Sequence, residues 1–206
     1  MMTCGTGNDS CYVDATQDQV VELASGGPDT VYITADYTLA INVENMIINE
    51  VSALDGTGNA LSNRLIDNAA DNVLTGLEGN DRLSAGLGND VLIGGVGREV
   101  LTGGGGADDF VFAELGSTNY NPLVVFNVFE DTIQLSGAVF GLDQGVIDAP
   151  EFALDSNATT AAQRIIYEQA NGDLYFDANG SGIGARQLIA LLVDRTLLTY
   201  ADIFGF

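Results

Sequence analysis

The chain has 206 residues and a formal net charge of −23 at pH 7, because 29 acidic residues face six basic ones and histidine is absent. Without histidine or lysine, the sequence excludes Ser-His-Asp and Cys-His catalysis, HExxH zinc sites and the phosphate-binding P-loop. So acidic a chain is repelled by nucleic acid and anionic lipid, and no apolar run is long enough for a membrane span. We therefore expect a cation to neutralise the charge and, with so few arginines, expect it to be a metal ion.

The first residues include the only two cysteines, Cys4 and Cys11. A disulfide between them is one alternative; two reduced residues that pack as small apolar side chains are the alternative that the sequence favours. Two thiolates alone do not make a zinc site. No basic region followed by an apolar run opens the chain, so we predict no N-terminal signal peptide.

Residues 4–57 contain three turn-like segments in which an oxygen-bearing side chain is followed two positions later by an apolar one. The segments are GTGNDSCY (5–12) with Asp9 and Cys11, GGPDTVY (26–32) with Asp29 and Val31, and VENMII (43–48) with Asn45 and Ile47. Their spacing predicts coils of uneven width in which the apolar residue points inward. Asp9 and Asp29 either bind a metal ion or only form turns.

Residues 58–111 repeat every nine positions as GNALSNRLI, DNAADNVLT, GLEGNDRLS, AGLGNDVLI, GGVGREVLT and GGGGADDFV. The eighth position is always large and apolar: Leu65, Leu74, Leu83, Leu92, Leu101 and Phe110. The sixth always carries a side-chain oxygen: Asn63, Asn72, Asp81, Asp90, Glu99 and Asp108. Glycine concentrates at positions one, two and four.

Each feature of the nonapeptide predicts a local structure. The part rich in glycine and asparagine forms a turn, because both residues adopt positive φ readily. The three residues that are left make one short strand with its middle side chain inward. Two turns and two strands complete a coil, and stacked coils pair each strand with the strand two repeats along the chain. We predict an all-β fold, a parallel β-solenoid filled by the eighth-position side chains.

In this solenoid the sixth-position side chains line two edges. Asn63, Asp81 and Glu99 stack on one edge, and Asn72, Asp90 and Asp108 stack on the other. Carboxylates stacked at the strand spacing of about 4.8 Å repel each other strongly. Carboxylates and turn carbonyls are hard oxygen donors, and calcium takes about six to eight of them. The sequence therefore predicts Ca²⁺ between the turns.

The nonapeptides resemble the hemolysin-type repeat GGxGxDxUx, also called the RTX repeat. By this resemblance, residues 58–112 form a β-roll with calcium between successive turns, held by sixth-position carboxylates and glycine carbonyls. One site is expected between turns 85–90 and 103–108, with Asp90 and Asp108. Another is expected between turns 76–81 and 94–99, with Asp81 and with Glu99, whose longer side chain departs from the pattern. The glycines expected to take part are Gly79, Gly86, Gly88, Gly95, Gly97, Gly104 and Gly106.

The same resemblance extends to the flanks of the roll. Residues 4–57 resemble the stretch that often precedes such blocks, which makes Asp9 and Asp29 candidate ligands. Turns that contain Asn63 and Asn72 lack the charge, so sites closed by them are expected to be weak or empty.

Residues 113–206 no longer follow the nonapeptide, and we expect them to form a β-rich cap on the roll. Apolar or alternating runs predict strands at 123–135, 164–169 and 173–177, the last two joined by a hairpin at Ala170-Asn171-Gly172. Residues 185–194 are either a strand or a short helix. DANGSG (177–182) is expected to be a turn, because the glutamate that an EF-hand loop needs at its twelfth position is missing.

The stretch 164–182 resembles the C-terminal end of RTX proteins that bacterial type I systems export. Residues 202–206, DIFGF, resemble the uncleaved export signal of such proteins, and a last strand docked on the core is a compatible role. The resemblance implies secretion from a Gram-negative bacterium through a type I (ABC) transporter.

The function that these features favour is a calcium-binding module that folds on meeting extracellular calcium and carries a C-terminal export signal. One alternative is an adhesive or carbohydrate-binding module. Another is the tail of a secreted hydrolase or epimerase whose catalytic domain lies upstream, outside this chain. We expect no catalytic activity in the chain itself. Glu130 and Asp131, or other acidic residues, could in principle act as a catalytic pair, but nothing in the sequence marks a cleft around them.

Overall fold

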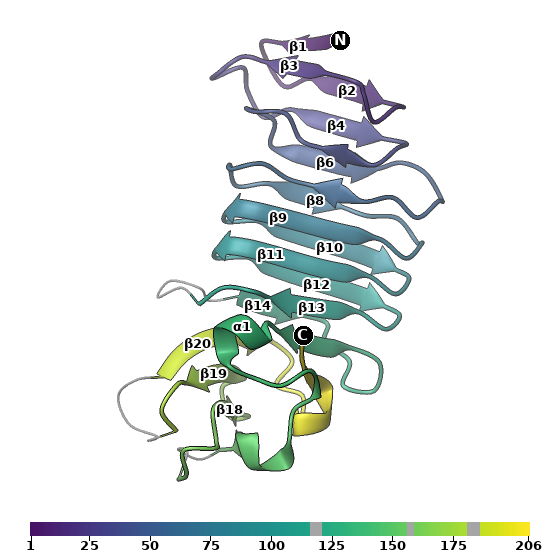
Figure 1. Ribbon diagram of the computed structural model, residues 1–206. Helices are drawn as coiled ribbons and strands as arrows, with labels where there is room; N and C mark the ends of the chain where they lie inside the picture. The colour runs from purple at the N-terminus through teal and green to yellow at the C-terminus, as the bar shows by residue number, and fades with distance from the viewer. Residues whose placement is uncertain (116–120, 156–158, 181–185) are drawn as a thin grey trace.

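The computed structural model describes residues 1–115, 121–155, 159–180 and 186–206. The chain winds into a column of stacked coils, with the N-terminus at one end and the C-terminal part packed at the other (Figure 1). Two sheets, of 11 and eight strands, run along the column, and a separate two-stranded sheet pairs β1 (Met2–Gly5) with β3 (Val20–Glu22). The predicted parallel β-solenoid is confirmed.

The 11-stranded sheet stacks the even-numbered strands from β2 to β14 and then β20, β19, β18 and β17. Its strands are β2 (Ser10–Val13), β4 (Thr30–Ile33), β6 (Asn45–Ile48), β8 (Arg64–Ile66), β10 (Arg82–Leu87), β12 (Val100–Gly105), β14 (Asn121–Val124), β17 (Phe152–Leu154), β18 (Ile165–Glu168), β19 (Asp173–Asp177) and β20 (Arg186–Leu192). The eight-stranded sheet contains β5 (Tyr37–Thr38), β7 (Gly56–Thr57), β9 (Val73–Gly79), β11 (Val91–Gly97), β13 (Asp109–Phe112), β15 (Thr132–Leu135), β21 (Ile203–Gly205) and β16 (Gly145–Val146). Neighbouring strands in the nonapeptide region are parallel.

The strands of the nonapeptide region pair as the repeat predicts. Leu83 pairs with both Leu65 and Leu101, and Leu92 lies between Leu74 and Phe110 in the other sheet. All six eighth-position side chains are at most 1% exposed. They fill the space between the two sheets, so the burial of these side chains is the main apolar contribution to stability here.

The four central strands of this region are longer than the three residues that the sequence predicted. β9 and β11 have seven residues and β10 and β12 have six. The reason is that ladder pairing continues into the glycine-rich turns, where Gly95 lies opposite Leu77 and Gly97 opposite Gly79. A Cβ added to Gly97 would overlap the carbonyl oxygen of Gly79, so only glycine allows coils to stack this closely.

Before the nonapeptides the column continues with strands β2, β4 and β6. Cys11 and Val31 point inward as predicted, but the next inward residue is Met46 and not Ile47. The prediction was one residue out of register, which in a strand exchanges the inner and outer faces. Glu44 consequently takes the sixth-position role that we assigned to Asn45, and its Oε2 accepts the Asp29 backbone N–H at 2.9 Å.

The two cysteines form a disulfide, Cys4–Cys11, with their Cα atoms 6.3 Å apart. The preference for reduced cysteines was therefore wrong. Cys11 is buried in the core as expected, and its sulfur also closes the loop that contains Asp9. A cross-link of this kind restricts the unfolded chain and thereby stabilises the folded loop.

The C-terminal part adds rungs to both sheets before it departs from the solenoid. β14 pairs with β12 and β20, and β15 pairs with β13 and β21, all in parallel. The predicted hairpin is confirmed by antiparallel β18 and β19. Residues 186–192 form a strand, the first of the two alternatives for 185–194, of which residue 185 lies outside the described residues.

Short helical elements complete this part: α1 (Gly137–Phe140) and the 3-10 turns η1 (Ala149–Glu151) and η2 (Tyr200–Asp202). They were not predicted from the sequence. In the segment expected to be a turn, the Asp177 carboxylate accepts the backbone N–H groups of Asn179 and Gly180, while residues 181 and 182 lie outside the described residues. In the described part of the chain no helix combines the length and apolar character needed to cross a bilayer.

The predicted domain boundaries at 57/58 and 112/113 stay predictions. The 11-stranded sheet runs without interruption from β6 to β8 and from β12 to β14, across both positions.

Candidate metal centre

The sixth-position side chains stack in two ladders along the column, one above the other in successive coils. Each aspartate uses its Oδ1 atom to accept the backbone N–H of the sixth-position residue one coil earlier. Asp81 accepts from Asn63 at 2.7 Å, Asp90 from Asn72 at 2.8 Å, and Asp108 from Asp90 at 3.0 Å. This bond fixes the orientation of each carboxylate and tilts it toward the preceding turn.

The second oxygen of each carboxylate has no such partner. The Oδ2 atoms of Asp81, Asp90 and Asp108 are buried and make no hydrogen bond. Buried polar atoms are nearly always paired, and an unpaired ionised oxygen in a low-dielectric interior is costly. These oxygens are therefore available to a cation between the turns.

The ion pairs found within the described residues do not involve the ladder carboxylates. The two ion pairs found within the described residues are Arg164–Glu151 at 3.4 Å and Arg186–Glu168 at 2.7 Å, both in the C-terminal part. The oxygen atoms of the ladders form an arrangement that suits a hard divalent ion.

Burial raises the pKa of the ladder carboxyls. The pKa of Asp81 rises to about 6, chiefly because burial removes water from the ionised form. Burial likewise raises the pKa of Asp108 to about 6, with added repulsion from Asp131 and Asp90, and raises that of Asp90. In the metal-free protein these shifts oppose ionisation, which a bound cation would favour.

Glu99 fits the ladder differently from the aspartates. It is fully buried, and neither of its carboxyl oxygens has a hydrogen-bond partner. Burial, together with repulsion from Asp81, raises its pKa to about 8. Its extra methylene is accommodated beside Gly94 and Gly97, where an added Cβ would contact the Glu99 side chain. Glu99 thus offers two free oxygens where an aspartate offers one.

The seven predicted glycines all have positive φ, between +94° and +151°. In all seven an added Cβ would lie against a carbonyl oxygen of the preceding coil. The turns thus stack so closely that no side chain would fit between them at these positions, on the same edges as the carboxylates.

Asp9 and Asp29 repeat this arrangement at the N-terminal end. The Oδ1 atom of Asp29 accepts the Asp9 backbone N–H at 2.8 Å, and the Oδ2 atoms of both residues are buried without a partner. They lie far along the chain from Asp81, Asp90, Glu99 and Asp108, as separate rungs of the column.

The sequence reasoning missed two ladder members after the nonapeptides and one buried acid within them. Asn121 and Asp131 accept the backbone N–H groups of Glu99 and Asp108, each at 3.0 Å, and so extend the ladders beyond the repeat. Asp67 occupies a first position, where most copies have glycine or alanine, and burial raises its pKa to about 7. An aspartate at this otherwise small position was the signal that could have marked Asp67 as unusual. Asn121 and Asp131 carried no such signal, because they lie outside the nine-residue spacing.

The column and its ladders define a β-roll repeat module with carboxylate-lined turns. Residues 57–92 and 75–110 match the family model of the RTX calcium-binding nonapeptide repeat, which describes four copies. Residues 57–110 of this chain therefore carry RTX calcium-binding nonapeptide repeats. The match covers a minority of the chain, so the parts outside it are described by their own geometry.

Among solved structures, the chain is similar to the solution structure of the AlgE6R3 subunit from the Azotobacter vinelandii mannuronan C5-epimerase. The similarity covers 71% of this chain and 80% of that chain, with 25% sequence identity and a TM-score of 0.47. A search of curated proteins found no match.

Proposed function

We propose that the chain is a calcium-dependent folding module of a secreted protein. The observation that carries this proposal is the pair of ladders of buried carboxylates whose second oxygens have no partner. Without a cation the folded column confines like charges at the strand spacing. With calcium the same charges become ligands, so the ion binds the folded chain much better than the unfolded one.

The proposed ligands within the nonapeptides are Asp81, Asp90, Glu99 and Asp108, together with carbonyl oxygens of the glycine turns. The pair Asp90 and Asp108 is the best candidate, because each has one oxygen fixed by a backbone N–H and one oxygen free. Hard carboxylate and carbonyl oxygens at turns suit calcium better than magnesium, which requires a small octahedral site and releases water reluctantly.

Calcium concentration then decides whether the column forms. Extracellular calcium modules bind with dissociation constants of roughly 10⁻⁴–10⁻³ M. At ten times its dissociation constant each ion stabilises the folded state by about 1.4 kcal/mol, so a few ions shift the equilibrium decisively. Such a chain is unfolded where calcium is scarce and folds where it is abundant, which suits export through a narrow channel.

The export route is part of the proposal. Its support is the resemblance of residues 164–182 and 202–206 to the C-terminal end of proteins that type I (ABC) transporters secrete. In the same proposal residues 4–57 lead into the roll, residues 58–112 form it, and residues 113–206 form the cap with the signal. A catalytic domain, in the alternative of an enzyme tail, would lie in an upstream passenger.

The test is circular dichroism of the purified full chain in calcium-free buffer, then with calcium or magnesium. We expect a cooperative gain of β-structure at millimolar calcium and little gain with magnesium. The same folded spectrum in chelator and in millimolar calcium would contradict the proposal.

A further inference from the structure

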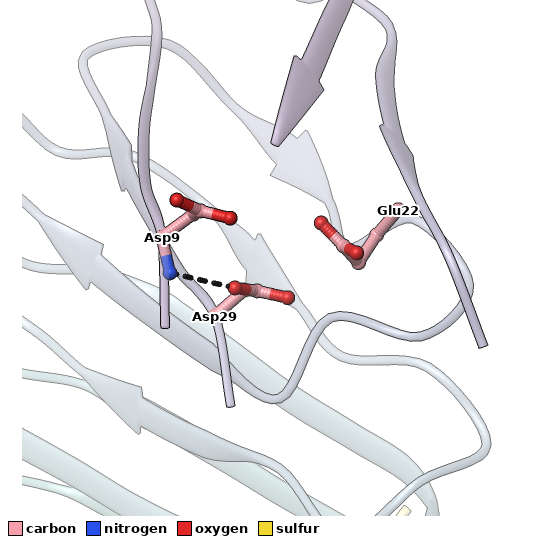
Figure 2. Close-up of side chains that lie close together, drawn as sticks. All are labelled: Asp9, Glu22 and Asp29. Atoms are coloured by element: carbon pink, nitrogen blue, oxygen red, sulfur yellow. Dashed lines mark hydrogen bonds between the residues drawn. The ribbon is translucent and has the colours of Figure 1, made fainter. Parts of the chain in front are cut away.

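Three carboxylates lie together at the N-terminal end of the column, outside the residues that match the RTX repeat. Asp9 precedes β2, Asp29 precedes β4, and Glu22 is the last residue of β3. One oxygen of each lies within 4.8 Å of the other two, and the side chains point toward one another (Figure 2). Across the described residues, no other group of three or more acidic or cysteine side chains meets so closely.

Two of these three side chains are almost completely buried. Glu22 is 5% exposed and Asp29 is 1% exposed. Glu22 Oε1 accepts the Leu23 backbone N–H at 2.6 Å, and Asp29 Oδ1 accepts the Asp9 N–H, but Glu22 Oε2 and the two aspartate Oδ2 atoms have no partner. Residues 1–63 contain no lysine, arginine or histidine. No basic side chain from this part of the chain compensates the three charges, so a bound cation would.

The fold explains why the Glu22 side chain points toward Asp9 and Asp29. In β3 the side chains alternate, with Val20 buried, Val21 exposed and Glu22 buried. In the regular coils the residue that faces inward just before the turn is small, as in Gly76 and Gly103, where an added Cβ would contact the free Oδ2 of Asp81 or Asp108. A side chain at this place is therefore aimed at the sixth-position carboxylate, and in the first coil that side chain is a glutamate.

We propose that Asp9, Glu22 and Asp29 form a three-carboxylate calcium site in which Glu22 supplies a ligand that the nonapeptide turns do not have. Calcium binds oxygen at about 2.3–2.6 Å, so ligands on opposite sides of the ion lie about 4.8 Å apart, and the three oxygens fall within this span. The Cys4–Cys11 disulfide closes the loop that holds Asp9 and so reduces the freedom this ligand loses on binding.

The experiment measures calcium bound per full-length chain by equilibrium dialysis over a series of buffered free calcium concentrations. Glu22→Gln keeps the size of the side chain and removes its charge. We expect it to remove one ion per chain at saturation or to weaken one site by about tenfold or more. The matched control is Glu50→Gln, at an exposed position with the same charge change, and it should bind as the unaltered chain does. Identical stoichiometry and affinity in Glu22→Gln and the unaltered chain would overturn the proposal.

Hydrogen exchange shows whether the ion lost in Glu22→Gln was bound at the N-terminal end of the column. With calcium present, Glu22→Gln should lose protection in residues 5–33 and keep it in residues 57–110. If this variant fails to fold at all, Glu22→Asp is the second test. It keeps the charge but withdraws the carboxylate by one methylene, so calcium binding at one site should weaken. Unchanged calcium binding in Glu22→Asp would again overturn the proposal.

This site and calcium-dependent folding of the repeats can fail independently. A chain that is folded in chelator, yet loses one ion in Glu22→Gln, would contradict the folding function and support the site. If the chain folds only with calcium, yet Glu22→Gln binds as many ions as tightly as the unaltered chain, the folding function is supported and the site is contradicted.

Discussion

Each sixth-position aspartate has two oxygens with different surroundings, and this difference decides what the residue can do. One oxygen is held by a backbone N–H of the preceding coil, and the other is buried and free. The repeat predicts which residues stack, because the spacing alone places them in register. It does not predict Glu22, because the meeting of Glu22 with Asp9 and Asp29 depends on coils of unequal length.

At this scale the first prediction concerns Asp90. Asp90→Asn keeps an oxygen to accept the Asn72 N–H but removes the charge, so the calcium midpoint of folding should rise several-fold. The control is Asp71→Asn at the neighbouring fifth position, which is exposed and also accepts a backbone N–H, from Asn89 at 2.7 Å. Both variants lose one charge and keep one hydrogen bond. Equal midpoints in a calcium titration followed by circular dichroism would show that Asp90 is not a ligand.

At the scale of the element, the glycine turns do more than reverse the chain. The sequence suggests loops between very short strands, whereas the ladder continues through Gly95 and Gly97 to their neighbours in the preceding coil. Composition could not reveal this, because glycine-rich segments are typical of turns whether or not they pair. The helix α1 was missed for a related reason: four residues, GAVF, carry no helical periodicity.

The second prediction compares two glycines with positive φ. Gly97→Ala places a Cβ against the Gly79 carbonyl oxygen, so it should destabilise the roll by more than the roughly 1–2 kcal/mol that a left-handed conformation costs a residue with a side chain. Gly145 also has a positive φ, but a Cβ added there would meet open space. Gly145→Ala should therefore show the conformational cost alone. Urea unfolding at saturating calcium measures both. Equal losses of unfolding free energy would mean that the coils are not stacked this closely.

At the scale of the whole molecule, the charge of −23 and the buried ladders make stability depend on both calcium and protons. Aspartate and glutamate have ordinary pKa values of 3.8 and 4.5, and burial raises those of Asp81 and Asp108 to about 6, Asp67 to about 7 and Glu99 to about 8. A carboxyl with a raised pKa in the folded state favours folding when protonated. Its contribution is fully present below the ordinary value and is lost as the pH rises through the raised value.

The third prediction is that acid partly replaces calcium. In calcium-free buffer the chain should gain β-structure as the pH falls from about 8 to about 5, because the ladder carboxyls take up protons in that window. With saturating calcium the gain should vanish, since the ion already offsets the charges and protons compete with it. Circular dichroism across this pH range with and without calcium makes the comparison. A metal-free chain that loses structure on acidification would contradict the assigned burial of these carboxyls.

The fourth prediction separates folding from export. Removing residues 203–206 would not do so, because Ile203 is fully buried, β21 pairs with β15, and the Phe206 N–H donates to the Leu135 carbonyl oxygen at 3.2 Å. We expect this deletion to destabilise the C-terminal part. Phe206→Ser is the cleaner change, because the side chain is 45% exposed and the backbone bonds stay.

Phe206→Ser should therefore fold with calcium at the same midpoint as the unaltered chain. If a type I transporter reads this terminus in the unfolded chain, the variant should accumulate in cells and fall several-fold in the medium. The assay is calcium titration of the purified variant together with its partition between cells and medium in a host with a matching transporter. Phe129→Ser is the control, since Phe129 is 92% exposed and distant in sequence from the terminus. Full export of Phe206→Ser would place the signal outside this side chain, and a shifted calcium midpoint would identify the terminus as a structural strand whose side chain also supports the fold.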